Sequence, residues 1–209
     1  MPRLNYQIIL HVMGLLLLCN GGFMLLATLV SYIYDDGVTL EISTAALVTL
    51  FTGTLLMFTT RGHSKEVKKR EGYIIVTFGW IFMALSGSLP YLISESIPTF
   101  TNAFFETMSG YTTTGASILN DIEAIPKGIL FWRSLTHWIG GMGIIVFTIA
   151  ILPLLGVGGV QLFKAEVPGP VADKIKPRVK ETAKILWMVY IGFTGLQTLL
   201  LGLAGMPWF

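Results

Sequence analysis

Five long apolar runs constrain this chain more than any other feature of its sequence. A helix needs about 20 predominantly apolar residues to cross a lipid bilayer, and each run comes close to that length or exceeds it. The first run is about twice as long as the apolar core of a signal peptide and has no clear small-residue cleavage site, so we interpret it as a retained span. The predicted fold class is an all-α membrane protein, with spans over residues 8–34, 42–60, 72–93, 129–155 and 185–203.

The composition supports lipid as the solvent. Hydrophobic residues make up 53% of the 209 residues and charged residues only 12%, whereas a soluble domain carries about 25% charged residues. A net charge of +2 without a basic face gives no indication of a nucleic-acid partner. The single cysteine, Cys19, lies within an apolar run, which excludes a disulfide framework or a multi-thiolate metal site within one chain.

The distribution of Lys and Arg predicts the orientation in the membrane. If the five spans alternate, 12 of the 14 basic residues fall on one side, and cytoplasmic loops are enriched in basic residues. We therefore expect a cytoplasmic amino terminus and an acidic outer face. For the basic cluster at residues 61–71, the alternative is a patch that binds lipid or nucleic acid.

The segment between the third and fourth spans predicts a pore loop. After Pro98 an apolar helical pattern runs only to Gly110, and about eleven residues at about 1.5 Å each reach about halfway through the hydrocarbon. Residues 112–117, with the sequence TTTGAS, then supply an extended polar return. Non-helical backbone at this depth is tolerated only where protein buries it or where it lines a watery cavity.

Cation binding through backbone carbonyls is the chemistry that this return favours. Channels replace the hydration shell of an ion with rings of carbonyl oxygens. Threonine favours extended backbone, glycine lets a carbonyl turn toward an axis, and the half-helix points its partially negative carboxyl end at the ion. The alternative, on composition alone, is that this segment is an ordinary Thr-rich turn that binds no ion. The residues that would supply the carbonyls are Thr112, Thr113, Thr114 and Gly115.

Two longer motifs carry a family resemblance: FFETMSGYTTTGAS at residues 104–117 and FWRSLTHWIGGMGI at residues 131–144. With them the chain resembles the amino-terminal part of the TrkH-type subunit in the Trk/Ktr/HKT superfamily of potassium transporters. The similarity extends over essentially all of the chain, and the first two spans resemble the extra helices of that subunit. The resemblance implies four non-identical helix–pore loop–helix repeats around one pathway.

The same resemblance implies how the chain is divided. Residues 1–71 would form two accessory transmembrane helices and a cytoplasmic basic loop, and residues 72–159 the first helix–pore loop–helix repeat. Residues 160–209 would form a cytoplasmic loop and the first helix of an incomplete second repeat. Because one filter loop cannot surround an ion, either the chain is a fragment of a protein more than twice as long or four copies assemble. The end of the chain within a repeat favours a fragment.

The resemblance also implies a substrate, partners and a location. Potassium would contact the filter carbonyls, those of Thr113 and Thr114 above all. In related plant transporters, glycine at the position of Gly115 is associated with potassium permeation and serine with a sodium preference. The family further implies the plasma membrane, a homodimer of the full-length protein and a cytoplasmic nucleotide-binding regulatory subunit. The basic, proline-containing loop after residue 159 would bind that subunit. The alternative is that this loop is a solvated connector.

Three side chains are expected to support the filter. Glu106 in the pore helix and Arg133 in the fourth span are costly unless paired, so we expect a buried ion pair. The alternative is that Arg133 extends to the interface and Glu106 meets water. His137, one turn from Arg133, is expected to be a hydrogen-bonded structural residue, with a proton relay as the alternative. The glycines that follow favour close packing over a hinge: Gly140, Gly141 and Gly143.

The predicted function is potassium uptake through a carbonyl-lined filter. The alternative is a non-transporting membrane scaffold or regulatory subunit, and the two differ in whether the reading frame continues into three further filter loops. No phosphate-binding loop, metal-ligand cluster or nucleophile–base spacing occurs in the sequence, so we expect neither an enzyme nor a covalent cofactor.

Overall fold

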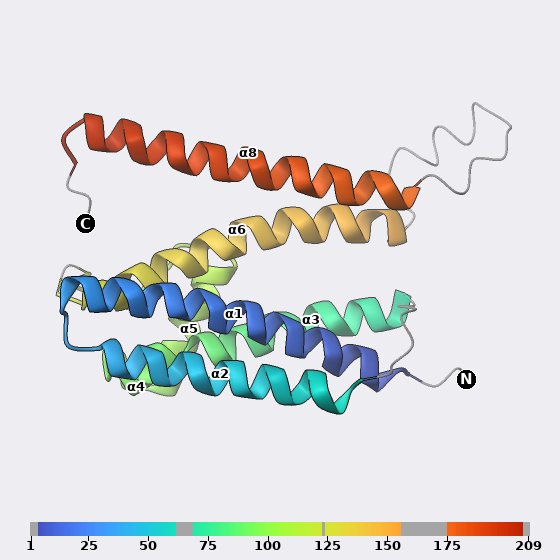
Figure 1. Ribbon diagram of the computed structural model, residues 1–209, viewed down its shortest axis with the longest axis horizontal. Coiled ribbons are helices and arrows are strands. Elements are labelled where there is room, and N and C mark those ends of the chain that lie inside the picture. Colours follow the sequence, from blue (N-terminus) through green and yellow to red (C-terminus); the bar gives the residue numbers. More distant parts are fainter. Residues whose placement is uncertain (1–3, 62–68, 123, 156–174, 207–209) are drawn as a thin grey trace, which may run out of the picture. The chain divides into compact units, whose positions relative to one another are not determined.

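Helices account for all the regular secondary structure among the residues that the structure describes. This computed structural model describes residues 4–61, 69–122, 124–155 and 175–206. Most of the predicted basic cluster at 61–71 and the first part of the predicted basic loop, through residue 174, lie outside the described residues. The helices, shown in Figure 1, are α1 (Tyr6–Tyr34), α2 (Thr39–Thr59), α3 (Lys69–Gly87), α4 (Leu89–Ile93), α5 (Phe100–Tyr111), α6 (Lys127–Leu155) and α8 (Ile175–Leu203).

Four helical stretches of the described chain are long and apolar enough to cross a membrane. They are Tyr6–Tyr34, Thr39–Thr59, Arg70–Ile93 and Ala183–Leu203, and they coincide with four of the five predicted spans. The fifth predicted span, 129–155, falls on α6, whose side chains from residue 144 onward lie outside the described ones. The predicted all-α membrane class is confirmed.

The third span is interrupted where α3 ends and α4 begins. Pro90 has no N–H to donate to the carbonyl one turn earlier, and proline is favoured only in the first turn of a helix. The chain therefore ends α3 at Gly87 and starts the one-turn helix α4 with Pro90 in its first turn. Backbone hydrogen bonds from Ser88 to the Ala84 carbonyl (3.0 Å) and from Leu92 to the Ser88 carbonyl (3.2 Å) keep the two helices nearly continuous.

Residues 1–141 form one compact unit, in which α1 and α2 pack as an antiparallel hairpin. A Cβ added at Gly14 or at Gly53 would lie 2.9 Å from the carbonyl oxygen of the other glycine. Small residues at such a crossing let the two helix backbones approach closely. Between this hairpin and the rest of the unit lies a core of fully buried side chains that includes Met24, Ala27, Ile42, Ala45, Tyr91 and Trp132.

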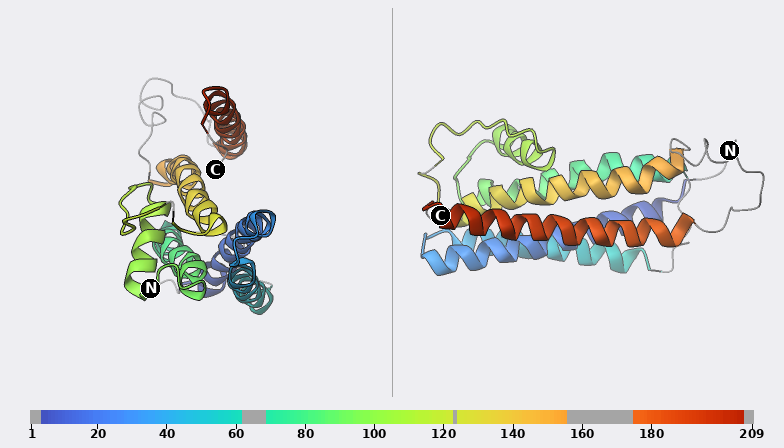
Figure 2. Two further views of the ribbon diagram at one scale, coloured as in Figure 1. Left: turned by 90° about the vertical axis from the view of Figure 1, so that its left-hand side faces the viewer. Right: turned by 90° about the horizontal axis from the view of Figure 1, so that it is seen from above.

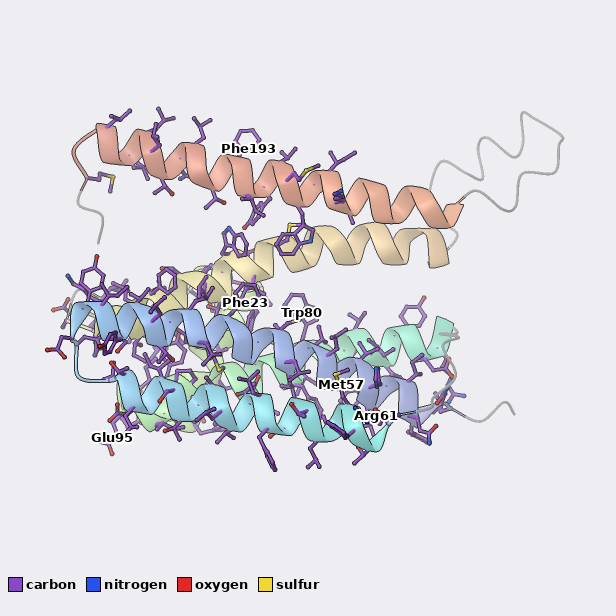
Figure 3. All side chains as sticks on the ribbon, viewed as in Figure 1. Phe23, Met57, Arg61, Trp80, Glu95 and Phe193 are labelled. Atoms are coloured by element: carbon purple, nitrogen blue, oxygen red, sulfur yellow. The ribbon has the colours of Figure 1, made fainter. Side chains whose placement is uncertain are left out.

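The two ends of this unit differ in charge. At one end the backbone N–H of Asn5 donates to Glu71, and Arg61 follows the end of α2. At the other end the Asp36 carboxylate accepts a hydrogen bond of 2.6 Å from the backbone N–H of Gly128. Figure 3 labels Arg61 and Glu95 at these opposite ends. Among the described residues, Arg61 thus lies at one end of this unit, and Asp36 and Glu95 lie at the other.

Residues 142–209 form a second unit, which we describe by itself. Its helix α8 is 29 residues long, and many of its described apolar side chains, from Ile185 onward, are exposed, among them Phe193 (66%, labelled in Figure 3) and Leu203 (78%). Such a surface suits contact with lipid or with other transmembrane helices.

Candidate functional site

The short helix α5 runs along only part of the length of the first unit (Figure 2). It has 12 residues, which at 1.5 Å per residue gives about 18 Å against a hydrocarbon thickness of about 30 Å. Thr99, which follows Pro98, is extended at φ −94° and ψ 131° and marks its start. Because the residue before a proline is disfavoured in a helix, Pro98 keeps Ile97 out of a helix and separates α5 from the preceding one. The helix ends at Tyr111, one residue after the predicted stop.

The chain leaves α5 through a tight cap rather than directly as an extended strand. The N–H of Thr114 donates to the Ser109 carbonyl at 3.0 Å, and the N–H of Thr113 donates to the Gly110 carbonyl at 2.9 Å. These two bonds form the Schellman pattern, in which the residue with left-handed backbone is usually glycine. Here Thr113 takes that conformation, with φ +54°, so the predicted return begins only at Thr114.

A β-branched residue with positive φ is a backbone outlier and costs about 1–3 kcal/mol. Thr113 holds this conformation while its hydroxyl donates to the Thr112 carbonyl at 2.7 Å, and the hydroxyls of Thr112 and Thr114 lie 2.8 Å apart. Gly115 also has positive φ, +75°, and a Cβ there would meet no atom within 4 Å. Residues 112–117 are exposed in the described unit, although the carbonyls of Thr112 and Ala116 already accept hydrogen bonds from the hydroxyls of Thr113 and Ser109.

The Glu106 carboxylate ties the return segment to α5. Its side chain is 0% exposed, and it accepts hydrogen bonds from the hydroxyl of Ser117 (3.0 Å) and from the backbone N–H of Ile118 (3.0 Å). The Ser109 hydroxyl adds a second tie, because it donates to the Ala116 carbonyl at 2.6 Å. The path of the chain after Gly115 is therefore defined by side chains of the helix before it.

The structure brings together the two side chains that the sequence paired. Arg133 Nε lies 2.7 Å from Glu106 Oε1, so one carboxylate joins α5, the return segment and α6. The contact between Arg133 and Glu106 is a charge-assisted hydrogen bond, which is shorter and stronger than a neutral one. His137 Nδ1 lies 3.0 Å from the Arg133 carbonyl oxygen of its own helix, as a hydrogen-bonded structural histidine would.

Glycines set the spacing between α5 and its neighbours. A Cβ at Gly140 would lie 2.1 Å from the carbonyl oxygen of Tyr111, and a Cβ at Gly110 would lie 2.2 Å from Thr136 Oγ1. On the other side, a Cβ at Gly87 would lie 2.6 Å from Thr107 Cγ2. The carboxyl end of α5 is therefore in backbone contact with α6, which agrees with the packing interpretation of Gly140.

Sequence reasoning missed two residues that hold this loop in place. Tyr111, fully buried at the end of α5, donates from its hydroxyl to Asn20 Oδ1 on α1 at 2.5 Å. The signal was an asparagine in the middle of an apolar run, which is costly in a membrane without a partner.

Among the residues that the structure describes, no three His, Cys, Asp or Glu side chains are placed to hold a metal ion.

A bundle of bilayer-length helices with a half-length helix and a tethered polar return defines an integral membrane protein that carries a pore-loop unit. The chain belongs to the TrkH family of cation transport proteins, whose pattern it matches over residues 40–204. Helix α1 lies outside that match, and the candidate loop lies within it.

Individual relatives support the same assignment. The chain is 45% identical over 208 residues to the Trk system potassium uptake protein TrkH of Salmonella typhimurium and 44% identical to that of Escherichia coli, covering 99% of this chain and 43% of either relative. The crystal structure of the potassium transporter TrkH from Vibrio parahaemolyticus superposes with a TM-score of 0.84 at 39% identity, over 98% of this chain and 41% of that one. The chain thus spans less than half the length of the relatives it matches.

Proposed function

We propose that this chain contributes one selectivity-filter loop to a protein that takes up potassium across the plasma membrane. The observation that carries the proposal is the half-length helix α5, followed by an exposed polar segment that buried side chains hold in one conformation. The transported ion is inferred from the family and from its relatives, which are named as potassium uptake proteins.

The proposed mechanism uses the backbone. The carbonyl oxygens of Thr112, Thr113, Thr114 and Gly115 replace part of the hydration shell of the ion. The partially negative carboxyl end of α5 adds a favourable potential for a cation. The inside-negative membrane voltage supplies about 2.3 kcal/mol per charge per 100 mV, so inward movement is electrically downhill.

A complete binding site needs further loops, because one strand covers only one side of an ion. We propose that three more repeats complete the ring, as the length of the relatives suggests, since the chain covers only 43% of them. In this arrangement residues 1–71 are accessory, residues 72–159 form the first repeat, and residues 160–209 begin the second. The amino terminus and the basic loops face the cytoplasm, where a nucleotide-binding regulatory subunit binds, and the full-length protein is a homodimer.

The test compares two substitutions at Gly115. Serine and alanine impose the same penalty for a side chain at positive φ, about 1–2 kcal/mol, and neither clashes, since the site is open. The product of the complete reading frame that contains residues 1–209 is reconstituted in liposomes, and potassium and sodium flux are measured. We expect potassium-selective flux in the wild type, and a lower potassium-to-sodium ratio in Gly115→Ser than in Gly115→Ala. No potassium flux in the wild type would refute the proposal, and an unchanged ratio in Gly115→Ser would refute the filter assignment.

A further inference from the structure

Asn20 is a polar side chain in the middle of the apolar helix α1, and it is 0% exposed. Its amide is hydrogen-bonded on both sides. Oδ1 accepts from the Tyr111 hydroxyl at 2.5 Å, and Nδ2 donates to Ser86 Oγ at 2.8 Å. Ser86 in turn donates to the Met83 carbonyl of its own helix at 3.1 Å. One asparagine therefore connects α1, α3 and α5 through a closed set of buried hydrogen bonds.

The partner that matters for function is Tyr111, because the proposed filter begins at the next residue. Its backbone is pressed against α6, where a Cβ at Gly140 would lie within 2.7 Å of the Tyr111 Cα, C and O atoms. Its ring lies 3.1 Å from the Cβ position of Gly87 on α3. Asn20 supplies the contact from α1, so Tyr111 is held by three helices.

Two aromatic contacts join the same helices. The ring of Trp80 on α3 lies 6.3 Å from the Tyr111 ring, and Phe23, one turn after Asn20, lies 6.2 Å from the Trp138 ring of α6 in an edge-to-face arrangement. Phe23 and Trp80 are labelled in Figure 3. In apolar surroundings the loss of one partner leaves the other polar group without a hydrogen bond, which costs more than the bond itself contributes.

We propose that Asn20, on a helix outside the matched family region, is a positioning residue for the filter loop. By holding the Tyr111 hydroxyl, it sets the position and tilt of the last turn of α5, and with them the direction of the first filter carbonyls. The inference rests on the proposed function for its effect on ions. Its structural part, the control of the loop by α1, stands independently of transport.

The test uses three variants and one control in the product of the complete reading frame. Asn20→Leu removes the acceptor for Tyr111 and also the donor to Ser86, Tyr111→Phe removes the donor with the ring kept, and a double variant combines the two. Thr49→Val is the control, because Thr49 is equally buried, at 2% exposure, and its hydroxyl bonds only to the Ala45 carbonyl of its own helix. The readouts are amide hydrogen exchange of residues 112–114 and the potassium-to-sodium flux ratio.

We expect Asn20→Leu and Tyr111→Phe each to raise exchange at residues 112–114 and to lower the flux ratio by roughly three- to tenfold, the equilibrium factor for one lost hydrogen bond. Because Asn20→Leu also removes the bond to Ser86, the double variant should do no more than Asn20→Leu alone. Exchange and selectivity equal to those of Thr49→Val would overturn the inference, and so would additive effects in the double variant. If Asn20→Leu does not fold, Tyr111→Phe decides the question against the same control. A wild type without potassium flux would refute the proposed function alone, since the exchange measurement would still test Asn20.

Discussion

Replacing Gly140 with alanine tests whether the spacing between α5 and α6 positions the loop. The added Cβ would lie 2.1 Å from the Tyr111 carbonyl oxygen, about 1.3 Å short of the 3.4 Å at which ordinary contact begins. The next two atoms, the Tyr111 carbonyl carbon and Cα, lie at 2.6 and 2.7 Å. All three belong to the backbone, so no change of side-chain rotamer relieves the overlap and the two helices must separate.

The expected loss of stability follows from two opposing terms. Overpacking a buried contact costs about 1–3 kcal/mol, and a clash with backbone belongs at the upper end. Alanine in a helix gains about 1 kcal/mol over glycine. We therefore expect Gly140→Ala to lower the free energy of unfolding by about 2 kcal/mol and to reduce potassium flux, because the Tyr111 carbonyl shifts with the clash.

The assay measures thermal unfolding in detergent and potassium flux in liposomes, with Gly22→Ala as the matched control. Gly22 lies within α1, and a Cβ there meets nothing within 4 Å, so this variant should be as stable as the wild type or more so. If Gly140→Ala unfolds at the temperature of Gly22→Ala and keeps wild-type flux, the reasoning from backbone contact is wrong.

Three further substitutions probe buried or partly buried polar groups, each by thermal unfolding in detergent. Glu106→Gln should lose about 3–5 kcal/mol, because it removes one partner of the buried ion pair and leaves Arg133 uncompensated; a change below 1 kcal/mol would contradict the pairing. Asp36→Asn should lose about 1–3 kcal/mol, because its carboxylate accepts hydrogen bonds from the backbone N–H groups of Val38 and Gly128; wild-type stability would refute that link. Tyr91→Phe should gain about 1 kcal/mol, because that hydroxyl is buried and has no hydrogen-bond partner among the described residues; a loss would mean that the hydroxyl is bonded after all.

The structure also changes what a charge reversal at the ion pair should do. From the sequence alone, exchanging the charges of Glu106 and Arg133 would be expected to restore function lost in either single variant. The carboxylate of Glu106, however, also accepts hydrogen bonds from Ser117 and from the backbone N–H of Ile118. An arginine at position 106 has no acceptor for these donors, so we expect the double reversal to restore flux only in part.

Much of the fold could be predicted because the local rules that govern it act along the chain. Apolar runs of bilayer length identify the spans, and Pro98 and the spacing after it identify the start and length of α5 to within a residue. The cap of α5 was less predictable. Threonine favours extended backbone, yet Thr113 takes a left-handed conformation because bonds to Ser109 and Gly110 and the ties from Glu106 outweigh its local preference.

The sequence by itself determined the class of protein, four of the five predicted spans, the half-length helix and the polar loop after it. These features depend on hydrophobicity, chain length and proline, which are properties of neighbouring residues. Only the tertiary structure showed that Asn20, 91 residues before Tyr111, bonds to it, and that Gly140 leaves room for the Tyr111 backbone. Such contacts join residues that are distant in sequence, and they form only when the helices pack, so no periodicity or local propensity encodes them.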